Sequence, residues 1–484
     1  MDLRLDAGRH HLSNGDQGLQ WGYLDDARTH FEAALLQFRG PELRVGEAHS
    51  LRGLSRVELG CGNLAIAEKH IREAMQVYQS VPMLLQKHDS DGVSFEVQHD
   101  AAEGEASSLV LLAEIMVRAG RNTTAREALS DARNRYRQLG EVPSAVGLWL
   151  LTGRLSLREG QFELAEKDYE TALELVVKFA DMPGEAAVQL SIAELHRLKG
   201  HIPRAESALE RVFYLADRMS SVAHKAKAAT AMGGLMLQKP NTERALHYYE
   251  EALQLAQRCR DTQSEGFALL GLGILISDSG EGGAMELFGA AARLFASLGH
   301  SHALGTTLLR MAQHGLRVEK PSFALVAAEM ARKMWEEDDP VQGVGQALRS
   351  QVKALARLEE WNALYLTACA RAIVAGQVQS NALDVWEFYR QRAPEALLDE
   401  LKGMPGSELI QRANRSVTNV IRGLLKQYGL PASTLDSVPN TLAVVGLLYK
   451  VETLARSKGR PPDEEFDLLG PDEEPIDANE DNDQ

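Results

Sequence analysis

Residues 160–175 read GQFELAEKDYETALEL, and the spacing of small and bulky residues in this stretch recurs along the chain. A turn residue, Gly160, is followed by Phe162, Ala165, Tyr169 and Ala172, which lie at helical intervals. Alanines equivalent to the central one occur at Ala27, Ala67, Ala125, Ala165, Ala205, Ala245, Ala284, Ala324 and Ala363. Consecutive members are 39 or 40 residues apart, except for one interval of 58. A register held this closely predicts a repeat array.

A second set of small residues lies upstream of each central alanine. The set comprises Ala113, Gly153, Ala193, Gly233, Gly273 and Ala312, and Trp149 lies one helical turn before Gly153. Small residues let two helices approach closely, while the bulky residue of each unit fills the space toward its neighbour. The pattern therefore predicts two packed helices in every unit, with glycine at the turn between them.

This pattern resembles the tetratricopeptide repeat (TPR) family over about residues 5 to 372. The period of about 40 residues exceeds the 34 of the standard repeat and resembles that of kinesin light chains, LGN-type polarity adaptors and bacterial peptide-sensing or transcriptional regulators. HEAT and armadillo repeats have a similar length but lack this Gly–aromatic–Ala–Tyr–Ala signature. The resemblance implies an all-α fold: a right-handed superhelix (α-solenoid) of about nine helix pairs, followed by C-terminal capping helices and a disordered tail.

Three regions are expected along the chain: the array over 1–372, a helical cap over 373–459 and a disordered acidic tail over 460–484. The 58-residue interval contains LLQKHDSDGVSFEVQHDAAEGE at 84–105, which is polar and uneven and predicts an inserted loop. In the cap, SELIQRANRSVTNVIRGLLKQYG and TLAVVGLLYKVETLARSKG keep helical spacing. Such helices would cover the apolar face that a terminal repeat exposes.

The net charge of −16 is concentrated at the C-terminus. Residues 461–484 hold eleven acidic and no basic residues, so the first 460 residues carry only −5. This balance argues against general affinity for nucleic acid or for an anionic membrane. No apolar run is long enough to span a bilayer, and Cys61, Cys259 and Cys369 are far apart. We expect a cytoplasmic protein with reduced thiols.

No constellation in the sequence predicts catalysis or a cofactor. The stretch GLGILI at 271–276 lacks the third glycine and the preceding strand of a dinucleotide-binding loop. His10 with His11, and His300 with His302, could share a metal, but no thiolate or carboxylate frame surrounds them, and we interpret them as polar positions. The sequence predicts no enzyme, no metal and no cofactor.

In TPR proteins the first helix of each unit lines a concave groove, and the resemblance places partner-binding residues there. The candidates are Arg52, Arg56, Arg118, Leu150, Arg154, Arg158, Arg197, Leu270 and Ile274. Arginine pairs carboxylates bidentately, so this groove would favour an acidic, partly apolar peptide. Alternatively, the arginines are solvated positions that pair with neighbouring glutamates.

The tail itself carries this chemistry, because Phe466, Leu468 and Leu469 lie among acidic residues. We predict a docking motif there, either for another protein or for the chain's own array. The best interpretation of the whole is a non-enzymatic adaptor or scaffold for protein–protein interaction in an intracellular signalling pathway, for example beside a protein kinase in a bacterium. The alternative is a peptide-responsive regulator that switches a partner such as a transcription factor or a kinase.

Overall fold

A computed structural model describes residues 2–21, 23–38, 43–85, 93–140, 143–239, 241–280, 282–336, 342–376 and 404–428, together with Leu397, Leu401 and Tyr449. These residues form helices and turns, and no strand occurs among them. The helices are α1 (Asp2–Trp21), α2 (Leu24–Gln37), α3 (Arg44–Gly60), α4 (Leu64–Leu85), α5 (Val93–Arg118), α6 (Asn122–Leu139), η2 (Pro143–Ala145), α7 (Val146–Arg158), α8 (Phe162–Lys178), α9 (Met182–Leu198), α10 (Ile202–Arg218), α11 (Val222–Gln238), α12 (Thr242–Cys259), α13 (Thr262–Ser279), α14 (Ala284–Ser297), α15 (Ser301–Arg317), α16 (Pro321–Trp335), α17 (Gln342–Arg357), α18 (Trp361–Gly376) and α21 (Gly406–Gln427).

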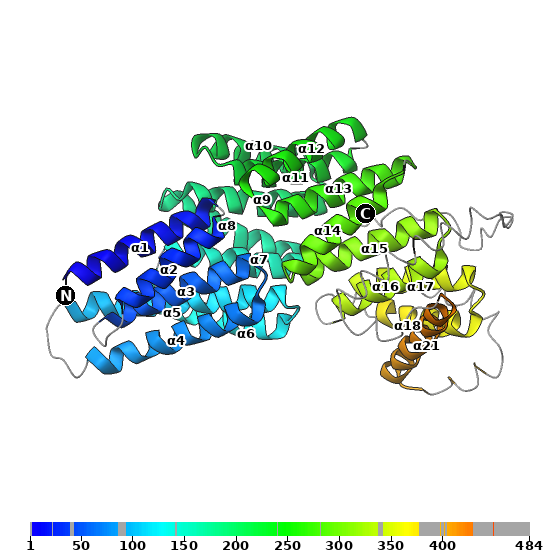
Figure 1. Cartoon of the computed structure of the whole chain (residues 1–484), viewed down its shortest axis with the longest axis horizontal. Helices are drawn as coiled ribbons and strands as arrows, with labels where there is room; N and C mark the ends of the chain where they lie inside the picture. Colours follow the sequence, from blue (N-terminus) through cyan, green and yellow to red (C-terminus); the bar gives the residue numbers. More distant parts are fainter. Residues whose placement is uncertain are drawn as a thin grey trace, which may run out of the picture. The chain divides into compact units, whose positions relative to one another are not determined.

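The chain divides into two compact units, mainly Met1–Leu272 for the first and Gly273–Ala296 with Ser301–Ile476 for the second. In the first unit the helices pack in consecutive pairs, α1 with α2 through α11 with α12 (Figure 1). The first helices of successive pairs also contact one another, α3 with α5, α5 with α7, α7 with α9 and α9 with α11. They therefore form one layer, and in the second unit α15, α16, α17 and α18 repeat this arrangement.

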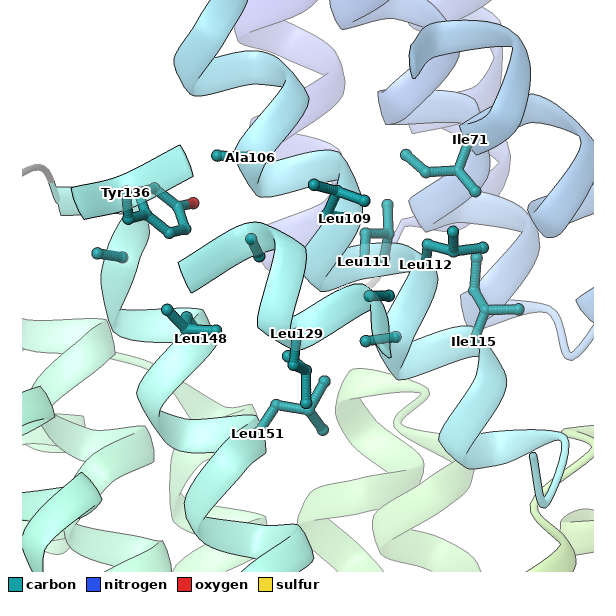
Figure 2. Close-up of a cluster of buried hydrophobic side chains, with 14 of the residues drawn as sticks. Ile71, Ala106, Leu109, Leu111, Leu112, Ile115, Leu129, Tyr136, Leu148 and Leu151 are labelled. Carbon is teal, nitrogen blue, oxygen red and sulfur yellow. The ribbon is translucent and has the colours of Figure 1, made fainter. Parts of the chain in front are cut away.

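The predicted register of the second helices is confirmed. All nine central alanines, from Ala27 to Ala363, are at most 2% exposed. Side chains from neighbouring pairs close the core between them: Figure 2 shows Leu129 of α6 beside Leu151 of α7, and Ile71 of α4 facing α5. Each pair thus buries its apolar face against the next pair, as a repeat array requires.

Aromatic side chains of the second helices lie against pairs of glycines. A Cβ on Gly15 would lie 2.7 Å from the ring of Phe31, and one on Gly53 would lie 2.4 Å from the same ring. The same arrangement occurs for Gly8, Gly46 and Phe38, for Gly233, Gly271 and Tyr249, and for Gly305, Gly343 and Trp335. In each case the two glycines are 38 residues apart, one on the first helix of the same pair and one on that of the next. One ring therefore joins three helices, which requires glycine on both sides of it.

The prediction of an inserted loop over 84–105 is wrong for most of that segment. Helix α4 runs to Leu85 and α5 begins at Val93, so the insertion mainly lengthens two helices. The polar residue Glu105 is only 7% exposed because Gln79 donates a hydrogen bond to it at 2.8 Å and Arg135 donates another at 3.1 Å. Charges that look solvated in the sequence are satisfied by neighbouring helices.

The first predicted cap helix is present as α21, which packs on α18. Its buried stripe consists of Leu409, Ala413, Val417, Ile421 and Leu425. The second predicted cap helix, apart from Tyr449, and the tail over 460–484 lie outside the described residues.

Candidate partner-binding surface

Three rows of side chains run across the first helices α5, α7 and α9. The first two rows occupy equivalent positions of successive repeats, and in the third row Arg197 lies one position before the equivalent one. The first row is aliphatic and contains Val110, Leu150 and Leu190; the second contains Glu114, Arg154 and Glu194; the third contains Arg118, Arg158 and Arg197. All nine are half-buried or exposed, and the three helices contact one another in order. We call these nine residues the inner surface.

The second row belongs to a longer series in which the charge alternates. Eleven residues before each central alanine of the first five units stand Asp16, Arg56, Glu114, Arg154 and Glu194. Asp16 and Arg56 pair across α1 and α3 at 2.8 Å. This part of the array is therefore a mixed surface, less uniformly basic than its arginines alone suggest.

Arg154 differs from the other charged members of the inner surface. Glu114 pairs with Arg118 at 3.1 Å, and Glu194 pairs with Arg197 at 2.7 Å, each within its own helix. Helix α7 contains no acidic residue. Arg154 is exposed and makes no hydrogen bond or ion pair with any described residue. The alternating series thus leaves one guanidinium at its centre available.

The side chain of Tyr169 lies near this arginine. A Cβ on Gly153 would lie 2.5 Å from the Tyr169 ring, so the glycine allows the ring of α8 to pack closely on α7. The hydroxyl oxygen is buried and has no hydrogen-bond partner among the described residues. Burial raises the pKa of Tyr169, an effect that the nearby charge of Arg154 opposes. The phenol therefore stays protonated and is a hydrogen-bond donor.

The remaining predicted arginines are already engaged or lie deeper. Arg52 donates to the hydroxyl of Ser107, and Arg118 also donates to the carbonyl oxygen of Leu59 at 3.1 Å. Arg158 is half-buried on α7. The alternative drawn from the sequence, arginines that pair with neighbouring glutamates, describes Arg118 and Arg197. Arg56 pairs with Asp16 instead, and Arg52 donates to a serine.

Two predicted residues on α13 do not join this surface. Leu270 is only 6% exposed, so its side chain is unavailable to a partner, because it packs inside the array. Ile274 is half-buried and belongs to the second unit. The predicted docking residues Phe466, Leu468 and Leu469 lie outside the described residues.

No group of three His, Cys, Asp or Glu side chains in the described part of the chain is arranged to hold a metal ion. None of the described helices is long and apolar enough to cross a membrane.

Three features define the architecture. The helices pack in pairs, the first helix of each pair carries a small residue, and the second helix carries the alanine–bulky–alanine series. The described helices form an array of helix pairs with a TPR-like arrangement. A scan against protein-family models and a search of curated proteins gave no match.

Three solved structures show the extent of the likeness. A Rap protein complexed with competence and sporulation factor is 13% identical over 75% of this chain and 98% of that chain, with a TM-score of 0.47. A signal transduction ATPase with a TPR sensor, from Pyrococcus horikoshii, is 14% identical over 83% of this chain and 66% of that one, with a TM-score of 0.44. The P58(IPK) TPR domain is 17% identical over 82% of this chain and 99% of that one, with a TM-score of 0.26. All three scores are below 0.5, so the fold assignment rests on the helix pairs themselves.

The charge alternation and the buried Tyr169 hydroxyl were not predicted from the sequence. The alternation is visible at a fixed offset of eleven residues before each central alanine. The position of the hydroxyl requires the packing of Tyr169 on Gly153, for which the sequence offers only the two residue types.

Proposed function

We propose that this protein is a non-enzymatic adaptor that binds acidic, partly apolar segments of partner proteins on the inner surface. The observation that supports this most directly is the exposed guanidinium of Arg154, for which the described part of the chain supplies no acidic partner. Arginine binds a carboxylate through two parallel hydrogen bonds, so one acidic side chain of a ligand would complete the site. Positioned helices that lack reactive groups suit the recognition of a segment better than its chemical conversion.

The aliphatic row of the inner surface indicates which side chains of a ligand should lie next to its acidic residue. Leu150 lies one helical turn before Arg154 on α7, with Val110 and Leu190 at the same level on α5 and α9. Apolar contact with these partly exposed side chains would contribute favourable free energy to binding. The contribution is about 25 cal/mol for each Å² of apolar surface removed from water. The matching ligand carries Leu, Phe or a similar side chain close to Asp or Glu.

The chain's own tail, DEEFDLLG at 463–470, has this composition, which makes it one candidate ligand besides other proteins. A signalling partner such as a protein kinase is proposed only from the family resemblance.

The test uses a fluorescein-labelled DEEFDLLG peptide and a counterpart in which lysine replaces every acidic residue. Fluorescence anisotropy with the full chain should show binding of the acidic peptide only, weakening as salt is added. Arg154→Glu should weaken binding at least about tenfold, which corresponds to about 1.4 kcal/mol. Lys167→Glu on the outer helix α8 is the matched control, because Lys167 is exposed and the charge change is the same.

Equal affinity in the Arg154→Glu variant and the parent would reject the inner surface as the site. The triple substitution Phe466→Ala, Leu468→Ala and Leu469→Ala in the full chain tests the tail separately. If the tail occupies the inner surface, these changes should raise the affinity for the added peptide. An unchanged affinity would remove the tail as a ligand and leave the proposal for other partners intact.

A further inference from the structure

Two histidines from different helices face each other in the first repeat. The Nδ1 atoms of His11 on α1 and His30 on α2 are 3.2 Å apart. The ring centroids are 5.5 Å apart, and both residues are half-buried, so each remains partly accessible to solvent. Neither the repeat pattern nor the proposed binding of partners accounts for this pair.

The helices that carry the two rings are fixed relative to each other. Phe38, which follows the last residue of α2, packs against Gly8 of α1, and Phe31 of α2 packs against Gly15, with Cβ positions that would lie 2.4 Å and 2.7 Å from the rings. His11 lies between these two glycines in α1, and His30 is adjacent to Phe31 in α2. Because both backbones are held by this packing, little further ordering is needed to bring the two imidazoles together.

The separation of the two nitrogens matches that of two ligands of one metal ion. Imidazole nitrogens bind zinc at about 2.0–2.1 Å, so two of them at a tetrahedral angle are about 3.3 Å apart, and at a right angle about 2.9 Å. The observed 3.2 Å lies between these values. When one Nδ1 carries a proton, the two atoms share a hydrogen bond; when both rings are protonated on Nε2, both Nδ1 atoms have lone pairs free for an ion.

We propose that His11 and His30 form a two-histidine binding site for a divalent transition-metal ion, which cross-links α1 to α2. Imidazole suits Zn²⁺, Ni²⁺ and Cu²⁺, and by the usual order of affinity Cu²⁺ binds most tightly. Water completes the coordination, since no third His, Cys, Asp or Glu of the described chain joins the pair. Ca²⁺ and Mg²⁺, which require oxygen ligands, do not bind there.

His10 provides a matched control within the same helix turn. Its ring centroid is 6.2 Å from that of His11, but its Nε2 faces the side chain of Asn14 at 3.2 Å and not His30. Substitution of His10 therefore removes one imidazole from the neighbourhood while leaving the proposed site unchanged.

Isothermal titration of the full chain with Zn²⁺ and with Cu²⁺ should show one class of site that His11→Gln and His30→Gln each remove and His10→Gln retains. Electron paramagnetic resonance of the Cu²⁺ complex should show coupling to two imidazole nitrogens in the parent and in His10→Gln, and to at most one in the other variants. Circular dichroism and thermal unfolding in EDTA establish that all variants are folded.

The proposal is overturned if the parent shows no such site, if His30→Gln retains it, or if Ca²⁺ competes for it. Competition by Ca²⁺ would assign the binding to oxygen ligands, of which the acidic tail holds eleven carboxylates. Because α5, α7 and α9 take no part in this site, its failure leaves the adaptor proposal unaffected, and the reverse also holds.

Discussion

At the scale of single residues, glycine determines how closely successive helix pairs approach. Phe31 occupies the space left by Gly15 and Gly53, and the same distance of 38 residues separates the glycines around three other rings. A side chain at either glycine would occupy the volume of the ring. In each of these repeats, one aromatic ring thus fills the volume that two glycines leave without a side chain.

Gly53→Ala should therefore destabilise the first unit. The added methyl group would lie 2.4 Å from the Phe31 ring, and overpacking of this kind costs about 1–3 kcal/mol. Gly147→Ala is the control, since its methyl group would meet only Val110 at 3.4 Å and alanine favours the helix by up to about 1 kcal/mol. Urea unfolding followed by circular dichroism measures both. If both variants unfold at the parent midpoint, the close approach of Phe31 and Gly53 is not needed for stability.

His224 gives the first unit a dependence on pH. Burial, and then the charge of Lys227, lowers the pKa of His224 to about 4 from the ordinary 6.5, while its Nδ1 lies 2.8 Å from the Ser221 hydroxyl. The unfolded chain therefore takes up a proton first as the pH falls. The contribution of His224 to the free energy of unfolding is complete above pH 6.5 and is lost as the pH falls from about 6.5 to 4. The whole loss amounts to up to about 3 kcal/mol.

Replacing His224 with Asn removes this titration. The difference in free energy of unfolding between parent and variant should be constant above pH 6.5. It should then change by up to about 3 kcal/mol as the pH is lowered to 4. Guanidinium unfolding at a series of pH values gives this difference. A difference independent of pH over the whole range would show that His224 has the same pKa in both states.

At the scale of the helix, the turns recur about every 20 residues with a positive backbone φ. Glycine occupies this position at Gly120, Gly160 and Gly200, whereas Ala180, Ser220, Arg260, Glu319 and Glu359 adopt the same sign of φ, between 51° and 59°. A side chain makes this conformation unfavourable by about 1–2 kcal/mol. Several turns of the array are consequently strained by their residue type.

Ala180→Gly should relieve this strain. Part of the gain is offset by the greater freedom of glycine in the unfolded chain, so the net stabilisation should be about 0.5–1 kcal/mol. Gly160→Ala should destabilise by a similar amount, because no atom lies within 4 Å of the added methyl group and only the backbone is affected. Thermal unfolding of the two variants should shift in opposite directions. Shifts of the same sign would contradict the conformational explanation.

The sequence predicted those helices whose pattern depends on local spacing. Ala165 and its equivalents predict the second helices correctly, because the helical spacing of the residues that become buried can be read within a single segment. The sequence predicts a loop for the first half of α5 because it does not show that Gln79 and Arg135, from other helices, stabilise Glu105. Leu270 was assigned to the groove although it packs inside the array, since exposure depends on neighbours that the sequence does not identify.

At the scale of the whole molecule, the alternation of charge reduces the part of the inner surface that the proposed function leaves for a partner. Arg56 and Arg197 are satisfied by Asp16 and Glu194, so the array neutralises most of its own inner charge. The sequence alone names these arginines as candidate partner-binding residues, because it does not show which of them the folded array already pairs. What remains is a small region around Arg154, where the proposed function expects a single acidic residue in a ligand to have the greatest effect.

Because each pair contacts mainly its neighbours, destabilisation should remain local within the first unit. Helix α3 contacts α1, α2, α4 and α5, whereas α10–α12 contact one another and α9. In a repeat array, stability is approximately a sum of terms for single repeats and for adjacent interfaces. Gly53→Ala should therefore accelerate amide exchange strongly in α1–α4, less in α5 and α6, and not measurably in α10–α12. Hydrogen–deuterium exchange by mass spectrometry gives this profile, with Gly147→Ala as the reference. A uniform increase in amide exchange from α1 to α12 would contradict this, because it would mean that the first unit opens as one cooperative block. The coupling between neighbouring pairs along the layer of first helices would then exceed the stability of any single pair.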